Sequence, residues 1–340
     1  MDDSALVRSI LSRGLAADRD IEVVASAADP YQARDAIVAH RPDVLTLDVE
    51  MPRMDGLQFL RKLMPQYPLP VIMVSSLTQQ GSRITLDALA AGAVDFVLKP
   101  SSNVASGLEG MLTEIRDKVK MAAAVDVSRF RNRPVAPRES EEVTALPQTT
   151  DKLIAIGAST GGTEAIRRIV AALPSHTPGI VIVQHMPAGF TRMFAERLDA
   201  TSAMSVREAR SGDRVMIGQV LIAPGDFHMQ VMRSGGEYRV VCRQGARVCG
   251  HRPSVDVLFR SVAKHVGPNA IGAMLTGMGA DGADAMVKLR ESGARTVAQD
   301  EATSVVFGMP REAYERGGAE RLSALDAIPD VFKRYLEEMG

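Results

Sequence analysis

Cysteine and surplus charge are both scarce in this chain of 340 residues. Its two cysteines, Cys242 and Cys249, are too few for a disulfide framework or for a zinc site with four cysteine ligands. Lysine and arginine total 40 and aspartate and glutamate total 41, a net charge of −1. Such a balance gives no electrostatic case for binding nucleic acid or an anionic membrane. We therefore expect no nucleic-acid partner.

Long apolar runs are also absent. No run approaches the ~20 residues that a transmembrane helix needs, and the acidic start Met1-Asp2-Asp3 is unlike a secretory signal peptide. We therefore expect a cytoplasmic protein without direct membrane insertion. The length of the chain favours two domains over one.

Both halves of the chain alternate short apolar runs with helical patterns, which is typical of βαβ units and parallel sheets. Between them, residues 128–151 are rich in Arg, Pro, Glu and Thr, which indicates a linker. We predict two doubly wound α/β domains, at residues 1–127 and 152–340. A hairpin is predicted around Ser234-Gly235-Gly236. The predicted strands are 22–27, 44–48, 71–74 and 94–98 in the first half, and 153–156, 180–184, 220–223, 270–275 and 295–299 in the second.

Polar residues gather where the strands of the first half end. Asp48, Ser75 and Lys99 follow three of them, and Asp2 and Asp3 precede the first helical pattern. Ligands of open α/β sheets bind beyond the carboxyl ends of the strands. Carboxylates suit Mg²⁺ and can attack a phosphoryl group. Alone, each residue also fits a cap, a turn or a solvated strand end, but together they favour a site.

Residues 2–125 resemble a response-regulator receiver domain, which implies a flavodoxin-like fold. The resemblance implies that Asp48 is the phosphoacceptor and that Mg²⁺ binds Asp3, Asp48 and the backbone carbonyl of Glu50, with Asp2 assisting through water. It also implies phosphoryl contacts from Ser75 and Lys99, and an aromatic switch residue at Phe96. The motifs that carry it are Asp2-Asp3-Ser4, Leu47-Asp48-Val49-Glu50-Met51-Pro52-Arg53-Met54-Asp55-Gly56, Ser75-Ser76 and Lys99-Pro100.

The first half departs from this family at its beginning. A receiver ordinarily starts with an apolar strand that ends in the acidic pair, whereas only Met1 precedes Asp2. We therefore expect the receiver to lack its first, central strand. Its two neighbours would lose backbone partners, at about 1–3 kcal/mol for each buried unpaired group. We hypothesise a translation start further upstream, which intact-mass measurement of the native protein would test.

The second half opens on a Gly-x-Ser-x-Gly motif at residues 157–161, between an apolar run and a helical pattern. In this context the motif describes a nucleophile elbow, with Ser159 at its apex. A phosphate-binding glycine loop is less compatible, because Ser159 occupies the place of a fingerprint glycine and no Lys-Ser/Thr follows Gly162. A simple turn between strand and helix remains an alternative on this stretch alone.

Two further residues follow strands of the same predicted sheet. His185 ends the run 180–184, and Asp281 follows a glycine-rich turn after the run 270–275. Serine, histidine and aspartate at one sheet edge form a nucleophile, a base and a group that orients the base. His185 could instead cap its strand and Asp281 could cap a helix, but their convergence with Ser159 favours the triad. The backbone N–H of Met278 is our candidate oxyanion donor.

The order Ser, His, Asp differs from the Ser, Asp, His order of α/β-hydrolases. Residues 152–320 are instead similar to the catalytic domain of bacterial chemotaxis protein-glutamate methylesterases, in which a receiver precedes this domain. The resemblance places the family's catalytic residues on Ser159, His185 and Asp281. The motifs are 157–164, 184–187, Phe190-Thr191, 223–225, His251-Arg252-Pro253-Ser254-Val255-Asp256, 275–282 and 306–310.

The second resemblance implies the reaction and the partners. It implies hydrolysis of glutamate γ-methyl esters on cytoplasmic helices of chemoreceptors, with release of methanol and no cofactor, and deamidation of certain receptor glutamines. It also implies a chemotaxis histidine kinase as phosphodonor. The unphosphorylated receiver is expected to cover the active-site edge, and phosphorylation at Asp48 to relieve this.

Overall fold

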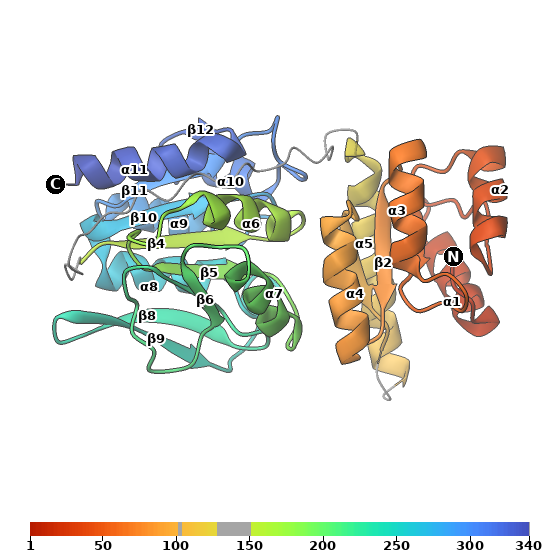
Figure 1. The fold of residues 1–340 in the computed structure, drawn as a ribbon, viewed down its shortest axis with the longest axis horizontal. Coiled ribbons are helices and arrows are strands. Elements are labelled where there is room, and N and C mark those ends of the chain that lie inside the picture. The colour runs from red at the N-terminus through yellow and green to blue at the C-terminus, as the bar shows by residue number, and fades with distance from the viewer. Residues whose placement is uncertain (101–103, 128–150, 340) are drawn as a thin grey trace. The chain divides into compact units, whose positions relative to one another are not determined.

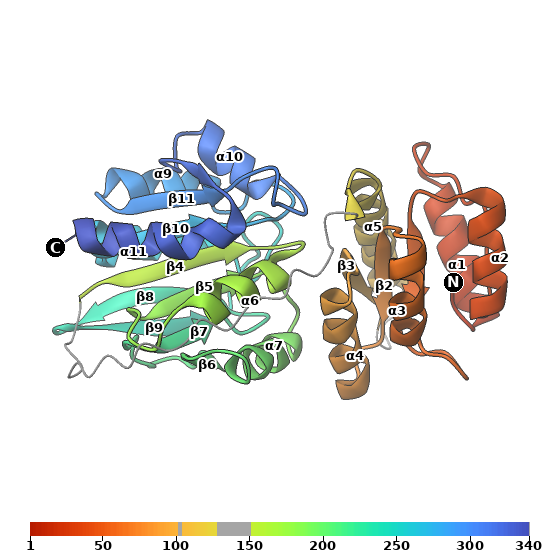
Figure 2. The ribbon, with the colours of Figure 1, turned by 45° about the horizontal axis from the view of Figure 1, so that its top comes forward.

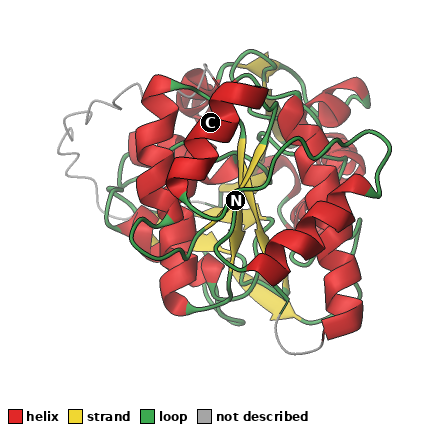
Figure 3. Cartoon of the chain, turned by 90° about the vertical axis from the view of Figure 1, so that its right-hand side faces the viewer, coloured by secondary structure: helices red, strands yellow, loops and turns green. Residues whose placement is uncertain are grey.

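The computed structural model describes residues 1–100, 104–127 and 151–339, which fall into two compact units, Met1–Asn132 and Arg133–Gly340 (Figure 1). Strands lie between helices in the cartoon of Figure 3. Nearly all of the predicted linker lies outside the described residues. In the described part of the chain, no helix is both long and apolar enough to cross a membrane.

The first unit contains a parallel sheet of three strands in the order β1-β2-β3. Helix α1 packs on α5 and α3 on α4, while α4 and α5 contact the sheet. Asp48 and Ser75 are the last residues of β1 and β2, and Lys99 directly follows β3. The elements are α1 (Ala5–Ala16), α2 (Pro30–His40), β1 (Leu45–Asp48), α3 (Gly56–Gln66), β2 (Val71–Ser75), α4 (Gln79–Ala90), β3 (Asp95–Leu98) and α5 (Val104–Ala123).

The strand predicted at residues 22–27 is wrong, because this segment forms no strand. Met1 and Asp2 lie between this segment and β1. The Met1 amine donates to the carbonyl of Thr46 at 2.7 Å, and the Asp48 N–H donates to the carbonyl of Met1 at 2.9 Å. On the other side, the Asp2 N–H donates to the carbonyl of Ala27 at 3.2 Å. A strand requires a row of backbone partners, and a single bond at Ala27 does not provide one.

The second unit is built on a parallel sheet of seven strands in the order β12-β11-β10-β4-β5-β7-β6. Helices α6, α7 and α11 lie on one face, and α8, α9 and α10 on the other (Figures 1 and 2). The strands are β4 (Leu153–Ala158), β5 (Ile180–Gln184), β6 (Ser205–Glu208), β7 (Gln219–Ile222), β10 (Ala270–Met274), β11 (Arg295–Gln299) and β12 (Leu322–Ser323). The helices are α6 (Gly162–Ala172), α7 (Phe190–Asp199), α8 (Val255–His265), α9 (Ala283–Glu291), α10 (Met309–Glu315) and α11 (Ile328–Glu338).

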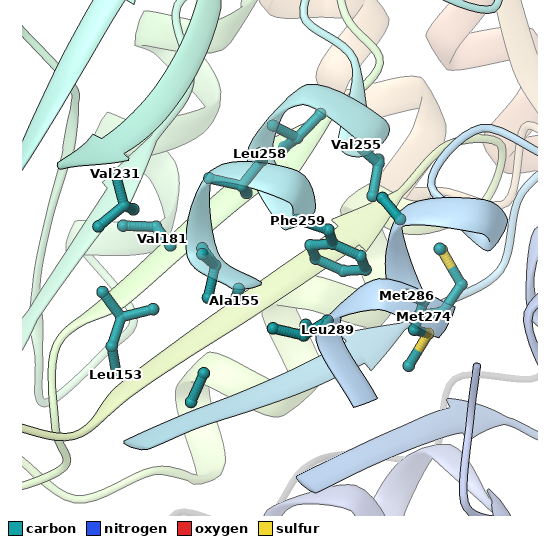
Figure 4. Packing of buried hydrophobic residues seen from close by; sticks show 14 of the residues in the cluster. Leu153, Ala155, Val181, Val231, Val255, Leu258, Phe259, Met274, Met286 and Leu289 are labelled. Carbon is teal, nitrogen blue, oxygen red and sulfur yellow. The ribbon is translucent and has the colours of Figure 1, made fainter. Parts of the chain in front are cut away.

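The predicted hairpin is present as β8 (His228–Ser234) and β9 (Glu237–Arg243), an antiparallel pair packed against α8. A buried apolar cluster joins this hairpin, α8, α9 and one face of the sheet (Figure 4). Leu153 and Ala155 point into it from β4, and Phe259 enters it from α8. All three side chains are fully buried, so the cluster holds the beginning of α8 against the sheet.

The strand order reverses direction at β4. From there the chain adds β5, β7 and β6 on one side and β10, β11 and β12 on the other. Such a switch point leaves a crevice at the carboxyl ends of the strands. Ser159 directly follows β4, His185 directly follows β5, and Asp281 lies in the connection from β10 to α9. All three therefore lie at the same edge of one sheet.

Candidate functional sites

Ser159 lies at the turn between β4 and α6, and the backbone of this turn is tightly bound. The Ser159 N–H donates to the carbonyl of Thr276 at 3.0 Å, and its own carbonyl accepts from the Gly162 N–H at 2.7 Å. Gly161 has φ +76°, a left-handed conformation that favours glycine. The sharp turn leaves the Ser159 side chain half-buried at the sheet edge.

His185 continues the pairing of β5 with β4 by one position, since its N–H donates to the carbonyl of Ala158 at 3.1 Å. The side chain of Gln184 bridges the two strand ends. Its Nε2 donates to the carbonyl of Ser159 at 2.9 Å and to that of His185 at 3.2 Å. A Cβ at Gly162 would lie 2.1 Å from Gln184 Oε1 and 2.7 Å from the Cβ of Ala158, so a larger residue there would displace these groups. The bridging role of Gln184 was not identified from the sequence, although the residue lies in the quoted 184–187 motif and is a polar residue that ends an apolar strand.

His185 and Asp281 form a hydrogen bond, with Nε2 of His185 2.8 Å from Oδ2 of Asp281. The carboxylate also accepts from the Ser254 hydroxyl at 2.7 Å and from the Val255 N–H at 2.7 Å. Burial opposes ionisation of Asp281, but the hydrogen bonds from His185, Ser254 and Val255 outweigh it and lower the pKa of this carboxyl. Asp281 is therefore a buried anion at neutral pH.

Asp281 also caps a helix, although not the one that follows it. Its carboxylate accepts from the Val255 and Asp256 amides, which begin α8. Ser254 occupies the N-cap position of α8 but makes no capping bond of its own, and its hydroxyl donates to Asp281. A negative charge at a helix N-terminus is stabilising. Ser254 was not identified from the sequence, although it lies in the quoted 251–256 motif.

The arrangement leaves one ring nitrogen of His185 available as a base. Nε2 faces an ionised carboxylate and carries its proton, so the lone pair lies on Nδ1. Within residues 151–339, Nδ1 is buried and has no hydrogen-bond partner, and the Ser159 hydroxyl makes no bond to it. Catalytic hydrogen bonds are often long without substrate. Nδ1 is thus the available acceptor for the Ser159 proton.

The predicted oxyanion donor, the Met278 N–H, directly follows a glycine that lies beside Ser159. A Cβ on Gly277 would lie 2.8 Å from the Cβ of Ser159, so the turn that contains Met278 passes close to the serine. The Gly277 N–H is engaged, donating to the carbonyl of Val306 at 3.1 Å. Across residues 151–339 the Met278 N–H has no hydrogen-bond partner, and its side chain is exposed. This leaves Met278 as the candidate donor.

Replacing Ser254 with alanine is expected to lower the free energy of unfolding by about 1.5–3 kcal/mol at pH 7, because a buried hydrogen bond to an anion is lost. The low pKa of Asp281 makes this contribution complete above the ordinary pKa of aspartate, and it disappears as pH falls through the lower folded-state pKa. Urea unfolding between pH 7 and pH 3 checks this. A stability difference that does not shrink with acid would contradict it.

Carboxylates also meet in the first unit, where Asp2, Asp3 and Asp48 offer oxygens within 4.8 Å of one another. Nζ of Lys99 lies 2.9 Å from Oδ2 of Asp2 and 2.9 Å from Oδ2 of Asp48. Burial raises the pKa of Asp48 to about 6, although its bond to Lys99 acts in the opposite direction. Three carboxylates around one point suit a hard divalent cation, which would lower that pKa again.

Ser75 is placed beside these groups but its hydroxyl is engaged elsewhere. It is fully buried, donates to the carbonyl of Ser76 at 3.2 Å and accepts from the Thr85 hydroxyl at 2.8 Å. A contact with a phosphoryl group would require these bonds to rearrange. Glu50 lies two residues beyond Asp48 and donates its N–H to Oδ1 of Asp48 at 3.3 Å. Phe96 is buried.

Comparison with known proteins gives matches for both units. Residues 154–332 match the CheB methylesterase family, and residues 1–105 match the response regulator receiver domain. The protein-glutamate methylesterase/protein-glutamine glutaminase of Syntrophotalea carbinolica is 65% identical over 341 residues, covering 99% of this chain and 97% of that protein. Protein-glutamate methylesterase/protein-glutamine glutaminase 2 of Pseudomonas aeruginosa is 53% identical over 340 residues, covering 100% of this chain and 97% of that protein.

A solved structure also matches the second unit. The crystal structure of the Thermotoga maritima CheB methylesterase catalytic domain covers 54% of this chain and 97% of that chain. Its TM-score is 0.53 and its sequence identity is 38%. Similarity in sequence thus extends over both halves, and similarity in structure over the unit that contains Ser159.

Proposed function

This chain belongs to the CheB methylesterase family of protein-glutamate methylesterases/protein-glutamine glutaminases, and we propose that it demethylates chemoreceptors with Ser159, His185 and Asp281 as its catalytic residues. The observation that carries the proposal is the pair of His185 and Asp281, whose bond at Nε2 leaves Nδ1 without a partner one strand away from Ser159. The proposed domains are 1–127 and 152–340, joined by a linker at 128–151.

The proposed first half-reaction forms an acyl-enzyme. Oγ of Ser159 attacks the γ-carbonyl carbon of the glutamate methyl ester while Nδ1 of His185 accepts its proton. The anionic Asp281 stabilises the imidazolium, and the Met278 N–H faces the developing oxyanion. When the intermediate collapses, the bond from carbon to the methoxy oxygen breaks. The imidazolium returns the proton to that oxygen, and methanol leaves.

The second half-reaction releases the product. Nδ1 of His185 takes a proton from water, whose oxygen attacks the acyl carbon. The bond to Oγ of Ser159 breaks, the proton returns to Oγ, and a glutamate carboxylate is formed. With a glutamine substrate the same steps release ammonia in place of methanol, which accounts for the second activity in the family name.

The decisive experiment is methanol release from a methylated chemoreceptor cytoplasmic fragment. A protein that only docks on receptors would bind the fragment and release no methanol, which would reject the proposed reaction. The substrates proposed here are cytoplasmic domains, so the proposed place of action is the cytoplasm, with a chemotaxis histidine kinase as phosphodonor. In the proposed mechanism, ester hydrolysis uses the chain's own groups and water.

Regulation is proposed to act through the receiver domain. Asp48 would accept the phosphoryl group on a carboxylate oxygen, and the carboxylates of Asp3 and Asp48 with the carbonyl of Glu50 would hold Mg²⁺. The cation would neutralise charge on the transferring phosphoryl group. Lys99, which already contacts Asp48, would pair with the phosphoryl oxygens. We propose that the unphosphorylated receiver restricts access to the catalytic edge.

A small-molecule phosphodonor with Mg²⁺ is therefore expected to raise the rate of methanol release by the wild-type chain at least about tenfold, a change of about 1.4 kcal/mol in access to the site. Asp48→Asn is expected to remove this increase and leave the basal rate, because an amide cannot form the acyl phosphate. The matched control is Asp35→Asn, at an exposed position on α2. Equal stimulation of wild type and Asp48→Asn would reject the assignment.

A further inference from the structure

A second imidazole lies against the proposed base. The rings of His185 and His251 are stacked, with centroids 3.7 Å apart and planes 9° from parallel. We infer that His251 is a positioning residue that fixes the ring plane of His185, an inference that rests on the proposed role of His185 as base. The bond from Nε2 to Asp281 fixes one corner of the ring. The stack restrains tilting of the ring about that corner and so keeps Nδ1 in the orientation proposed for accepting the Ser159 proton.

A tight turn holds His251 in place. Val248 and His251 pair through both backbone bonds, N–H to carbonyl, at 3.0 and 2.9 Å. Between them, Cys249 and Gly250 have φ values of +51° and +81°. Two left-handed residues closed by such a pair are typical of a type I′ hairpin turn, in which glycine at the second position relieves strain. His251 is therefore part of a built turn rather than a loose loop.

The segment around this turn is anchored on both sides. The carbonyl of Ala246 lies 2.8 Å from Nε2 of His228, on β8. Nε of Arg252 donates to Oδ1 of Asp226 at 2.9 Å. Three residues after His251, Ser254 donates to Asp281. One continuous segment thus holds both the base, through a ring face, and the carboxylate, through hydrogen bonds.

The stack has a chemical consequence as well as a geometric one. When His185 accepts the Ser159 proton, its ring becomes a cation that faces an aromatic ring. A cation over an aromatic face is stabilised electrostatically, and flat rings pack well in offset stacks. Both effects require a flat ring at position 251 rather than its nitrogens. Phenylalanine should therefore replace His251, whereas alanine and leucine should not.

The test uses the full chain with phosphodonor and Mg²⁺, and measures kcat and KM for methanol release. His251→Ala and His251→Leu are each expected to lower kcat by about 10- to 100-fold, since small misplacements of a catalytic group have effects of this size. The KM of both variants should stay within about twofold of wild type, because substrate binding is untouched. His251→Phe should keep kcat within about threefold of wild type, because the ring is retained. His176→Ala, at an exposed site, is the matched control.

A second measurement does not depend on turnover. In the ¹⁵N-histidine-labelled chain, the Nε2–H signal of His185 should be sharp in wild type and in His251→Phe, and broadened or shifted in His251→Ala and His251→Leu. Unchanged kcat in the alanine and leucine variants, or a phenylalanine variant that is as slow as alanine, would overturn the inference. A wild-type chain that releases no methanol would reject the proposed function instead, while the signal still reports whether the stack orders the ring.

Discussion

Ser159→Ala is expected to reduce methanol release from a methylated chemoreceptor fragment by at least about 10⁴-fold, as for other serine nucleophiles. Alanine has no oxygen that can form the acyl-enzyme. The turn itself should persist, because its hydrogen bonds to Thr276, Gly162 and Gln184 all use the backbone of residue 159. We therefore expect the free energy of unfolding to change by less than about 0.5 kcal/mol. Methanol assay and urea unfolding of the same preparation check both halves of the expectation.

A matched control is Ser234→Ala, at an exposed position at the end of β8, which should retain full activity. Residual turnover by Ser159→Ala within about tenfold of wild type would show that water is activated without a covalent step. The acyl-enzyme mechanism would then be wrong. A large loss of stability would instead indicate that the serine hydroxyl supports the turn, contrary to the backbone contacts described above.

Asp281→Asn is expected to lower kcat by about 10³- to 10⁴-fold, the size found for the corresponding change in a serine protease. An amide can present its NH₂ group to Nε2 of His185 and stabilise the tautomer with the proton on Nδ1. That tautomer cannot accept the proton of Ser159. Methanol release at saturating receptor fragment measures the effect.

Unlike Ser159→Ala, the change at Asp281 is expected to lower the free energy of unfolding by about 3–5 kcal/mol, because at least two buried hydrogen bonds to a carboxylate, each worth about 1.5–3 kcal/mol, are lost. The carboxylate accepts bonds from His185, Ser254 and the first amides of α8, and an amide can accept at only one of its two terminal atoms. Urea unfolding at pH 7 measures this loss. Full stability combined with low activity would contradict the capping role of Asp281, and full activity would contradict its place in the triad.

Much of the second unit follows from sequence pattern. Three of its central strands, β4, β5 and β10, are largely continuous apolar runs because both of their faces are covered by helices. Because ligands lie beyond the carboxyl ends of parallel strands, Ser159, His185 and Asp281 could be selected as candidate site residues from the sequence alone. The short strand β6 and helix α10 were not predicted, since four and seven residues carry too little periodicity.

Residues that support the site were harder to find. Gln184 bonds the carbonyl of Ser159, 25 positions away in sequence, and Ser254 bonds the carboxylate of Asp281, 27 positions away. No local spacing encodes such contacts. The stack of His251 on His185 likewise depends on a turn after β9 that meets a strand 66 residues earlier. In the first unit, segment 22–27 has strand-like composition but forms no strand, because backbone pairing with a neighbouring segment determines whether such a sequence becomes one.

The turn that presents His251 has a practical consequence, because its tip is Cys249. The chain has only one other cysteine, Cys242. Burial, followed by the charges of Asp213 and Glu208, raises the pKa of the Cys242 thiol to about 12, which suppresses its reactive thiolate. Cys249 is exposed. The native sequence therefore already offers one accessible attachment point for a fluorophore or a spin label, two residues from the ring that packs on His185, and needs no engineered cysteine to report on this edge.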